Sequence, residues 1–386
     1  MEYRLDKYGN KLSVLGMGCM RFPRDRAETE QMLMAAIDGG VNFFDTAYLY
    51  PGSEAALGDI LHRNNRRGDV FIATKLPLML CRSAADFDRF FNESLRRLKT
   101  DYVDYYFMHS MSDFAQWQRM LDMGIEGWLA AKKASGQIRQ AGFSYHGTYS
   151  EFEKVLDGFD WDFTMIQYNY YDENYQAGRQ GLKAAAAKGL PVIIMEPLLG
   201  GRLANGLPNA AIDAFAKADP APTPAQWAIW WLMDQPEVSV VLSGMTSAAI
   251  LNANLQTCAN PRKLTPDDHA AYKNVVKIFR ETFKYKCTGC NYCLPCPMGI
   301  NIPACLTAYN TSYARGFRTG IVLYATSTAL IRREHNSPRK CNNCGKCEPL
   351  CPQKIPIRQA LKQVGRRFEP LPLRAILALI RRIVTK

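Results

Sequence analysis

The chain has 386 residues, 47% of them hydrophobic, and its formal charge at pH 7 is +12. This length exceeds one small domain and suits a barrel-sized domain followed by a smaller one. The chain has no low-complexity tract, which excludes extensive disorder. Its basic and aromatic residues are not interleaved, so the positive charge does not indicate nucleic-acid binding.

The remaining explanations for the charge are a solvated surface or an anionic substrate, cofactor or redox partner. The N-terminal segment MEYRLDKYGNKL is polar and has no apolar signal-peptide core. No stretch approaches the ~20 uninterrupted apolar residues of a membrane span. We therefore expect a cytoplasmic protein.

Short apolar runs alternate with helical patterns between Lys11 and about Leu255. The runs are KLSVLGMG, VNFFD, DVFIATK, YVDYYFMH, IRQAGFS, FTMIQYN, LPVIIME and VSVVLSG, with helix-like segments such as ETEQMLMAAIDGG, ADFDRFFNESLRRLK and PAQWAIWWLMDQ between them. Apolar strands covered by helices form parallel sheets. Eight such repeats predict a closed (β/α)8 TIM barrel. The segment GMGCMRFP lacks G-x-G-x-x-G spacing, which argues against a doubly wound dinucleotide-binding fold.

The rest of the chain predicts a small, mostly helical domain. Residues 266–283 and 304–333 have helical character, and LPLRAILALIRRIVTK at the C-terminus predicts an amphipathic basic helix. We expect this last helix to pack against the protein, with weak contact to an anionic membrane surface as the alternative. The expected domains are residues 1–265 and 266–386.

Chemically active side chains follow the ends of three predicted strands. Asp45 ends VNFFD, Lys75 ends DVFIATK and His109 ends YVDYYFMH, while Tyr48 and Tyr50 lie just beyond Asp45. In a barrel of this kind the chemistry is carried by the C-terminal ends of the strands.

These residue types suit the reduction of a carbonyl, which needs a hydride at carbon and a proton at oxygen. A phenol has a pKa near 10, and an adjacent ammonium lowers that value. A carboxylate keeps the ammonium fixed and charged. A histidine can hydrogen-bond the carbonyl and orient it.

The same residues carry a resemblance to the aldo-keto reductase superfamily over Lys11 to Leu255. The matching motifs are Asp45-Thr46-Ala47-x-x-Tyr50, Gly52-Ser53-Glu54, Leu57-Gly58, Ala73-Thr74-Lys75 and Asp101-Tyr102-Val103-Asp104-Tyr105-Tyr106 leading to His109. The resemblance implies a catalytic tetrad of Asp45, Tyr50, Lys75 and His109. Tyr50 would be the proton donor, because the family places its tyrosine five residues after the aspartate.

The resemblance also implies a nicotinamide cofactor. Ser144 and Gln167 match the residues that hold the nicotinamide amide, and Asn254 matches the residue that contacts adenine. The full set of implied cofactor residues is Ser144, Gln167, Glu196, Leu198, Gly200, Gly201, Arg202, Ser243, Gly244 and Asn254.

Two departures from the family pattern concern how the nicotinamide ring is held. Tyr145 and His146 follow Ser144 where the family commonly has Asn, and Glu196 stands where the family often has a stacking aromatic ring.

The choice of dinucleotide stays open between NAD(H) and NADP(H). NADP-specific relatives place Lys or Arg where this chain has Gly244 and Ile250. The missing cations weaken the case for NADPH, because a 2′-phosphate wants cationic partners, and leave NADH possible. Arg202 could supply one charge, so NADPH remains an alternative.

Eight of the twelve cysteines form two runs with cluster-binding spacing. We name Cys287-x2-Cys290-x2-Cys293-x2-Cys296-Pro the first cysteine run and Cys341-x2-Cys344-x2-Cys347-x3-Cys351-Pro the second cysteine run. The second fits the ferredoxin pattern, and the first is one residue shorter. Two runs predict two 4Fe–4S clusters. A zinc ribbon, the alternative, would leave half of these cysteines unused.

In two-cluster ferredoxins the fourth cysteine of each run serves the other cluster. This rule predicts one cluster on Cys287, Cys290, Cys293 and Cys351, and the other on Cys341, Cys344, Cys347 and Cys296. Each oxidised cluster with its thiolates carries about −2, so the loaded chain has a charge of roughly +8. The tail resembles ferredoxin-type modules fused to other oxidoreductases, and the whole chain resembles an iron–sulfur-fused aldo-keto reductase.

The leading hypothesis is an oxidoreductase that moves hydride between NAD(P) and a small carbonyl or alcohol, with clusters that are structural or exchange electrons with ferredoxin or another redox partner. One alternative is a ferredoxin-coupled, flavin-dependent reductase, since a cluster moves one electron and nicotinamide two. No flavin motif is visible. The other alternative is a non-catalytic, redox-sensing barrel.

Overall fold

The computed structural model describes residues 1–330 and 336–371, and these fall into two compact units. The first unit comprises Met1–Pro197 and Gln226–Leu264, and the second comprises Leu198–Ala225 together with the described residues from Thr265 onward. The predicted basic helix LPLRAILALIRRIVTK lies outside the described residues except for its first residue, Leu371. The expected boundary between residues 265 and 266 stays a prediction.

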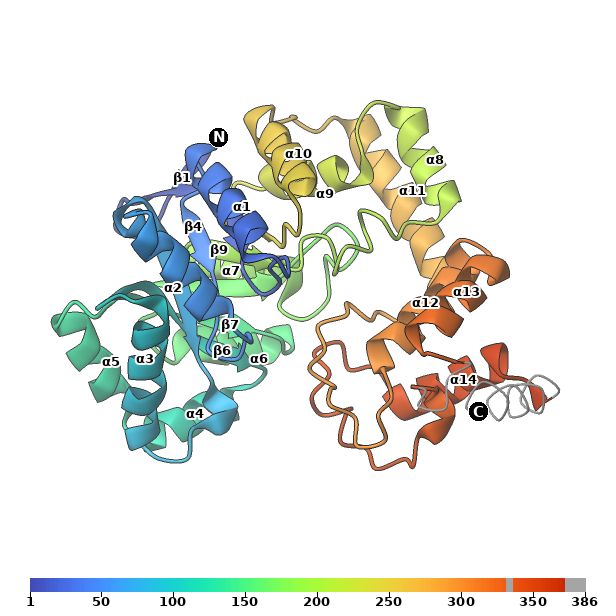
Figure 1. Cartoon of the computed structure of the whole chain (residues 1–386). Coiled ribbons are helices and arrows are strands. Elements are labelled where there is room, and N and C mark those ends of the chain that lie inside the picture. The colour runs from blue at the N-terminus through green and yellow to red at the C-terminus, as the bar shows by residue number, and fades with distance from the viewer. Residues whose placement is uncertain (331–335, 372–386) are drawn as a thin grey trace. The chain divides into compact units, whose positions relative to one another are not determined.

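The first unit is built around a closed barrel of eight parallel strands (Figure 1). The strands in barrel order are β10 (Val238–Ser243), β3 (Leu15–Gly18), β4 (Phe43–Asp45), β5 (Phe71–Leu76), β6 (Val103–Met111), β7 (Ile138–Tyr145), β8 (Phe163–Gln167) and β9 (Val192–Met195). The predicted barrel is therefore confirmed, and each of the eight apolar runs contributes one barrel strand.

Helices follow the strands along the chain, as a (β/α)8 fold requires. In the first unit they are α1 (Arg26–Asp38), α2 (Ser53–Arg63), α3 (Ala85–Leu98), α4 (Phe114–Asp122), α5 (Ile125–Ala134), α6 (Tyr149–Asp157), α7 (Gly178–Ala187), α9 (Pro224–Met233) and α10 (Ala248–Ala259), with 3-10 turns at Arg67–Asp69 and Leu78–Leu80. Their apolar faces pack inward, for example Phe87, Phe91 and Leu98 of α3, which are buried.

The run KLSVLGMG forms two strands rather than one. Lys11–Ser13 is β2, which pairs antiparallel with β1 (Tyr3–Leu5), and the barrel strand β3 begins at Leu15. The hairpin was not predicted, because three-residue strands leave little periodic signal.

Aromatic side chains fill the barrel interior. Tyr105 packs edge-on against Phe43 and Phe163 with ring centroids 5.0 Å apart in both pairs, and Phe107 lies 4.7 Å from Phe163. Such pairs contribute about 0.5–1.5 kcal/mol beyond the area that they bury. The barrel centre is thus a packed core, as is usual for this fold.

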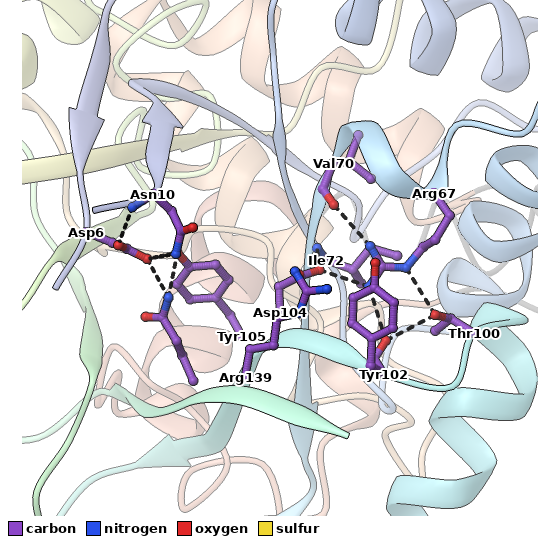
Figure 2. A network of polar contacts seen from close by, with 11 residues as sticks. Asp6, Asn10, Arg67, Val70, Ile72, Thr100, Tyr102, Asp104, Tyr105 and Arg139 are labelled. Atoms are coloured by element: carbon purple, nitrogen blue, oxygen red, sulfur yellow. Dashed lines mark hydrogen bonds and ion pairs between the residues drawn. The ribbon is translucent and has the colours of Figure 1, made fainter. Parts of the chain in front are cut away.

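Two buried carboxylates organise polar contacts near the N-terminal ends of β6 and β7 (Figure 2). Asp6, in the β1–β2 turn, accepts hydrogen bonds from the Tyr105 hydroxyl at 2.6 Å, from the Asn10 side chain at 2.8 Å and from Gln140. Asp104 accepts from the Ile72 backbone and from Arg67, both at 2.9 Å. In barrels this end carries stability rather than chemistry.

The second unit consists of helices and two cysteine-bearing loops (Figure 1). Its helices are α8 (Asn209–Ala218), α11 (Pro266–Thr282), α12 (Ile302–Ala314), α13 (Phe317–Ser327) and α14 (Ile357–Phe368), with a 3-10 turn at Pro338–Lys340. The helix predicted over residues 266–283 is α11. The apolar segment 304–333 is broken after Ala314, where Arg315 and Gly316 separate α12 from α13.

This unit has its own hydrophobic core between α12, α13 and α14. Phe368 of α14 stacks on Tyr324 of α13 with ring centroids 4.6 Å apart. Tyr309 of α12 contacts the Phe368 ring edge-on. Buried Ile302, Leu306 and Leu361 belong to this core, as do several cluster-run cysteines at its edge.

Candidate active site and cluster sites

The predicted catalytic side chains come together at the C-terminal ends of β4, β5 and β6. Lys75 Nζ donates a 2.6 Å hydrogen bond to Asp45 Oδ1 and another of 2.6 Å to the Thr46 carbonyl. Lys75 is 1% exposed and Asp45 is 5% exposed. The two charges therefore form an ion pair inside the barrel.

Burial acts against both members of this pair. It lowers the pKa of the Lys75 ammonium and raises the pKa of the Asp45 carboxyl, and their mutual attraction and hydrogen bond oppose both shifts. A lysine whose pKa is lowered gives up and takes back a proton more readily than a surface lysine.

The two candidate tyrosines have different surroundings. The Tyr50 ring centroid lies 4.9 Å from Lys75 Nζ, and the ring meets His109 edge-on at 6.0 Å. The Tyr48 ring instead packs against Phe90 at 4.9 Å and under the Arg97 guanidinium at 4.4 Å. Of the two tyrosines, Tyr50 is the one whose ring contacts Lys75 and His109.

His109 is buried within the same group of residues. Burial, and then the positive charges of Lys75 and His146, hold the pKa of His109 well below its usual value. The imidazole is therefore neutral at pH 7, with one nitrogen that donates and one that accepts. Its Nδ1 is buried and has no hydrogen-bond partner among the described residues.

Glu54 supports this site, although sequence analysis assigned it no role beyond its place in a motif. Glu54 is 1% exposed at the start of α2. It accepts a 2.7 Å hydrogen bond from Thr74, the neighbour of Lys75, and pairs with Arg97 at 3.2 Å. It thereby ties α2 and α3 to the strand that carries Lys75. Its place in the Gly52-Ser53-Glu54 motif was the signal that could have found it.

The predicted cofactor residues of the first unit lie at the C-terminal ends of neighbouring strands. Ser144 is on β7, Gln167 ends β8, Glu196 follows β9 and Ser243 ends β10, with Gly244 next to it. The Ser144 hydroxyl accepts a 2.8 Å hydrogen bond from the Ser110 backbone. Asn254 of α10 donates a 2.8 Å hydrogen bond to Ser243.

Gln167 is oriented from both ends of its amide. Its nitrogen donates to Asp172 at 3.1 Å, and its oxygen accepts from Gln176 at 3.0 Å. Asn169 donates at 3.1 Å to the Glu196 carbonyl, which joins the loop after β8 to the one after β9. Buried hydroxyl and amide groups at the C-terminal ends of the barrel strands suit a ligand that carries a carboxamide, as nicotinamide does.

The other predicted cofactor residues belong to the second unit. Leu198, Gly200, Gly201 and Arg202 follow β9 and group with the cluster loops. A Cβ on Gly200 would lie 2.0 Å from the Thr288 carbonyl oxygen, so this glycine permits a close backbone approach to the first cysteine run. The Arg202 guanidinium lies 4.3 Å from the centre of the Phe283 ring and 3.5 Å from the Cys287 carbonyl.

The cysteines line two cavities in the second unit. The larger, about 200 Å³, is lined by Cys293, Cys296, Cys341, Cys344 and Cys347. The smaller is lined by Cys287, Cys290, Cys293 and Cys351. Each cavity combines cysteines from both runs, and Cys293 borders both.

The donor chemistry of these cavities fits iron–sulfur clusters. The larger cavity offers five thiols to a group larger than one ion, and four cysteines line the smaller one. A zinc ion needs its sulfur ligands about 2.3 Å from a single point, and among the described residues no three Cys, His, Asp or Glu side chains are grouped that tightly. Burial raises the pKa of Cys287 to about 11, while Arg202 acts in the opposite direction. A cysteine binds metal as the thiolate, so cluster binding would release the proton of this thiol.

The other four cysteines are buried, as expected for small apolar side chains. Cys19, Cys81, Cys258 and Cys305 are each at most 2% exposed. Within residues 1–330 and 336–371, no helix is both long and apolar enough to cross a membrane.

Comparison with known proteins identifies both parts of the chain. The Aldo/keto reductase family profile matches residues 14–277, and a 4Fe-4S dicluster domain matches residues 286–356. The chain belongs to the aldo/keto reductase family of oxidoreductases and carries a ferredoxin-like fusion at its C-terminal side.

Individual relatives agree with this assignment. An uncharacterized oxidoreductase, YqkF, of Bacillus subtilis is 26% identical over 299 residues, which cover 69% of this chain and 93% of the relative. An aldo-keto reductase of Mycolicibacterium vanbaalenii is 30% identical over 267 residues, covering 68% and 88%. A 6-dehydroglucose reductase of Novosphingobium aromaticivorans is 30% identical over 273 residues, covering 64% and 86%.

A solved structure shares the fold. The holo form of aldo-keto reductase AKR11C1 from Bacillus halodurans superimposes with a TM-score of 0.61 at 24% identity, covering 71% of this chain and 96% of that one.

Proposed function

We propose that the protein transfers hydride between a nicotinamide cofactor and a carbonyl or alcohol substrate, with Tyr50 as the proton donor. The observation that carries the proposal is the buried Lys75–Asp45 ion pair, 2.6 Å between Nζ and Oδ1, with the Tyr50 ring 4.9 Å from the same ammonium. An ammonium at this range favours the phenolate and so makes the phenol a better acid.

Each tetrad residue then has one task. When bound, the nicotinamide supplies the hydride. Tyr50 gives a proton to the carbonyl oxygen, and Lys75 stabilises the phenolate that remains. Asp45 keeps Lys75 in place. The neutral His109 orients the carbonyl by a hydrogen bond without competing as a charged acid.

We also propose that NADH is the preferred dinucleotide. Gly244 and Ile250 are exposed and uncharged where a 2′-phosphate would need a cation. Arg202, the remaining candidate cation, is engaged with Phe283 and the Cys287 carbonyl of the second unit. We therefore expect a higher kcat/KM with NADH than with NADPH on the same substrate.

The cluster assignment is part of the proposal. Two 4Fe–4S clusters would be held crosswise, one on Cys287, Cys290, Cys293 and Cys351 and one on Cys341, Cys344, Cys347 and Cys296. The cavity linings support this pairing, because Cys351 lines the cavity of the first run and Cys296 lines that of the second.

The two tyrosines provide a matched test. A panel of aldehydes, ketones and alcohols is assayed anaerobically with each dinucleotide, and the best substrate is used for the variants. Tyr50→Phe should lower kcat by at least 100-fold, since general acid catalysis contributes about 10²–10⁴. Tyr48→Phe should stay within about threefold of wild type, because its ring packs on Phe90 and Arg97.

Iron content and visible absorbance must be unchanged in both variants. If Tyr48→Phe were the damaging change, or if Tyr50→Phe retained full turnover, the assignment of the proton donor would be wrong.

A further inference from the structure

The charge of the chain is divided unevenly along its length. Residues 265–386 contain 21 of the 48 Lys and Arg but only 6 of the 36 Asp and Glu, so this part has a net charge of +15 while residues 1–264 have −3. Two oxidised clusters with their thiolates would lower the net charge of residues 265–386 by about 4. The excess positive charge therefore belongs to the part that holds the cysteines.

Part of this charge forms a line along one side of α14. Arg358, Lys362 and Arg366 are spaced four residues apart and all three are exposed. Side chains at this spacing lie above one another on a helix. The opposite side of α14, with Ile357, Leu361 and Phe368 among its residues, is buried in the core of the second unit.

This line begins at the larger cluster cavity. Arg358 lines that cavity together with Lys346, which is exposed. Arg358 pairs with Glu348 at 2.7 Å, which offsets its charge. Among the described residues, Lys346, Lys362 and Arg366 form no ion pair, so their charges face solvent unopposed.

The same cavity reaches the surface through apolar and sulfur-bearing side chains. Cys344 is exposed, and Met298 and Leu350, which also line the cavity, are 38% and 46% exposed. The smaller cavity is lined in part by buried Cys351, Ile302 and Leu306, and the residues that line it include no Lys or Arg.

We propose that this surface docks an acidic one-electron carrier protein, which reduces the cluster held by the second cysteine run. We call it the second-cluster face and define it as Lys346, Arg358, Lys362 and Arg366 with Met298 and Leu350. The inference rests on the cluster assignment under the proposed function and deepens it by naming the kind of partner and its place of contact. An apolar centre with a charged surround is how protein–protein interfaces are built.

The step is a single electron transfer. The reduced carrier loses one electron, the oxidised cluster gains it, and no bond or proton changes. Opposite charges on the two surfaces raise the rate of encounter by about 10–10³, and salt screens this gain. The alternative occupant, an anionic lipid surface, is less suited, because the apolar side of α14 is already buried and cannot enter a bilayer.

The test uses the full cluster-loaded chain and an acidic flavodoxin reduced to its hydroquinone. Loss of one electron gives the flavodoxin semiquinone, whose absorbance can be followed by anaerobic stopped flow beside the bleaching of the clusters. Lys362→Glu is the test variant, because it is not adjacent to any cysteine in the sequence. Lys273→Glu on α11 changes the net charge equally and lines neither cavity, so it is the matched control.

We expect Lys362→Glu to slow the second-order reduction at least tenfold at low ionic strength, and Lys273→Glu to slow it less than twofold. The difference should vanish at high salt. Reduction by the small methyl viologen radical should be the same in all three proteins, as should iron content and cluster spectra.

Equal rates for the two variants, or a wild-type rate independent of salt, would overturn the proposal. So would binding to phosphatidylserine vesicles that Lys362→Glu abolishes while the flavodoxin rate is unchanged. A milder Lys362→Gln variant should lie between wild type and Lys362→Glu, which separates a charge effect from damage to the fold. Tyr50→Phe should accept electrons at the wild-type rate, so failure of the hydride proposal is distinguishable from failure of this one.

Discussion

The barrel and the cluster-bearing unit obtain their order from different sources. The barrel closes eight strands into one hydrogen-bonded sheet around an aromatic interior, and its buried charges are paired by side chains of the chain itself. In the second unit, the loops that carry the cysteines contain little helix and no strand among the described residues. We expect such loops to depend on metal for their conformation, because the energy of metal binding is then folding energy.

The difference has a practical consequence, because the two parts can be observed separately. The chain has six tryptophans, and Trp117, Trp128, Trp161, Trp227, Trp230 and Trp231 all belong to the first unit. The wavelength of tryptophan emission therefore reports on the folding of the barrel. Visible absorbance reports on the clusters.

The largest expected effect comes from removing the iron. Treatment with a chelator under reducing conditions should abolish hydrogen-exchange protection in residues 286–301 and 341–356, which carry the cysteines and lack regular helices for most of their length. The barrel strands should keep their protection, and tryptophan fluorescence should stay native. Simultaneous loss of both signals would show that the barrel also depends on the metal.

The next largest effect is expected from replacing single cysteines, which tests the crosswise ligand pairing. Cys351→Ala and Cys290→Ala should each remove the same cluster, and iron should fall from about eight to about four atoms per chain. Cys344→Ala should remove the other one. Electron paramagnetic resonance of the reduced proteins distinguishes the two clusters. If Cys351→Ala lost the same signal as Cys344→Ala, each run would hold its own cluster.

The sequence was a good guide wherever the signal was local. Eight apolar runs gave eight barrel strands because burial on both faces demands apolar residues without alternation. The residues predicted at the ends of three strands lie together around Lys75, since parallel strands bring their carboxyl ends to one edge of the sheet.

Contacts between distant segments could not be predicted. The segment Leu198–Ala225 lies within the sequence of the barrel but groups with the second unit, through contacts such as Gly200 with Thr288 of the first cysteine run and Phe215 with Tyr272 of α11. No propensity or spacing in the segment records those partners. The same holds for Asp6, whose partner Tyr105 is 99 residues away.

Substitutions at two neighbouring glycines can test whether this segment belongs to the second unit. Gly200 and Gly201 both have positive φ, +65° and +88°, so alanine is strained at either. At Gly201 a Cβ has open space, whereas at Gly200 it would lie 2.0 Å from the Thr288 oxygen. Gly201→Ala should cost about 1 kcal/mol, and Gly200→Ala roughly 2–4 kcal/mol, because overpacking adds to the strain.

The measurement is the rate of cluster loss on chelation and the denaturant midpoint of cluster absorbance. Gly200→Ala should weaken the cluster unit and leave the tryptophan transition unchanged. Equal effects of the two variants would mean that the close approach to Thr288 does not exist in solution.

The smallest expected effect concerns the barrel and the carboxylate of Asp6 (Figure 2). Burial alone would raise the pKa of Asp6, but hydrogen bonds from Tyr105, Asn10 and Gln140 together lower it below its usual value of 3.8. Asp6→Asn keeps the size and removes the charge. We expect it to lower the free energy of barrel unfolding by about 2 kcal/mol, the usual contribution of hydrogen bonds to a charged group.

The pH dependence follows from the direction of this pKa shift. A carboxylate whose pKa is lower in the folded state stabilises the fold above its unfolded pKa, and the stabilisation is lost as the pH falls through the folded pKa. The difference between wild type and Asp6→Asn, from denaturant unfolding followed by tryptophan fluorescence, should therefore be constant at neutral pH and shrink below about pH 4. Asp160→Asn, at an exposed carboxylate beside Lys7, should change stability by less than about 0.5 kcal/mol at any pH. A difference that grew as the pH fell would mean that Asp6 is held protonated, and the barrel would then rest on a neutral network at this end.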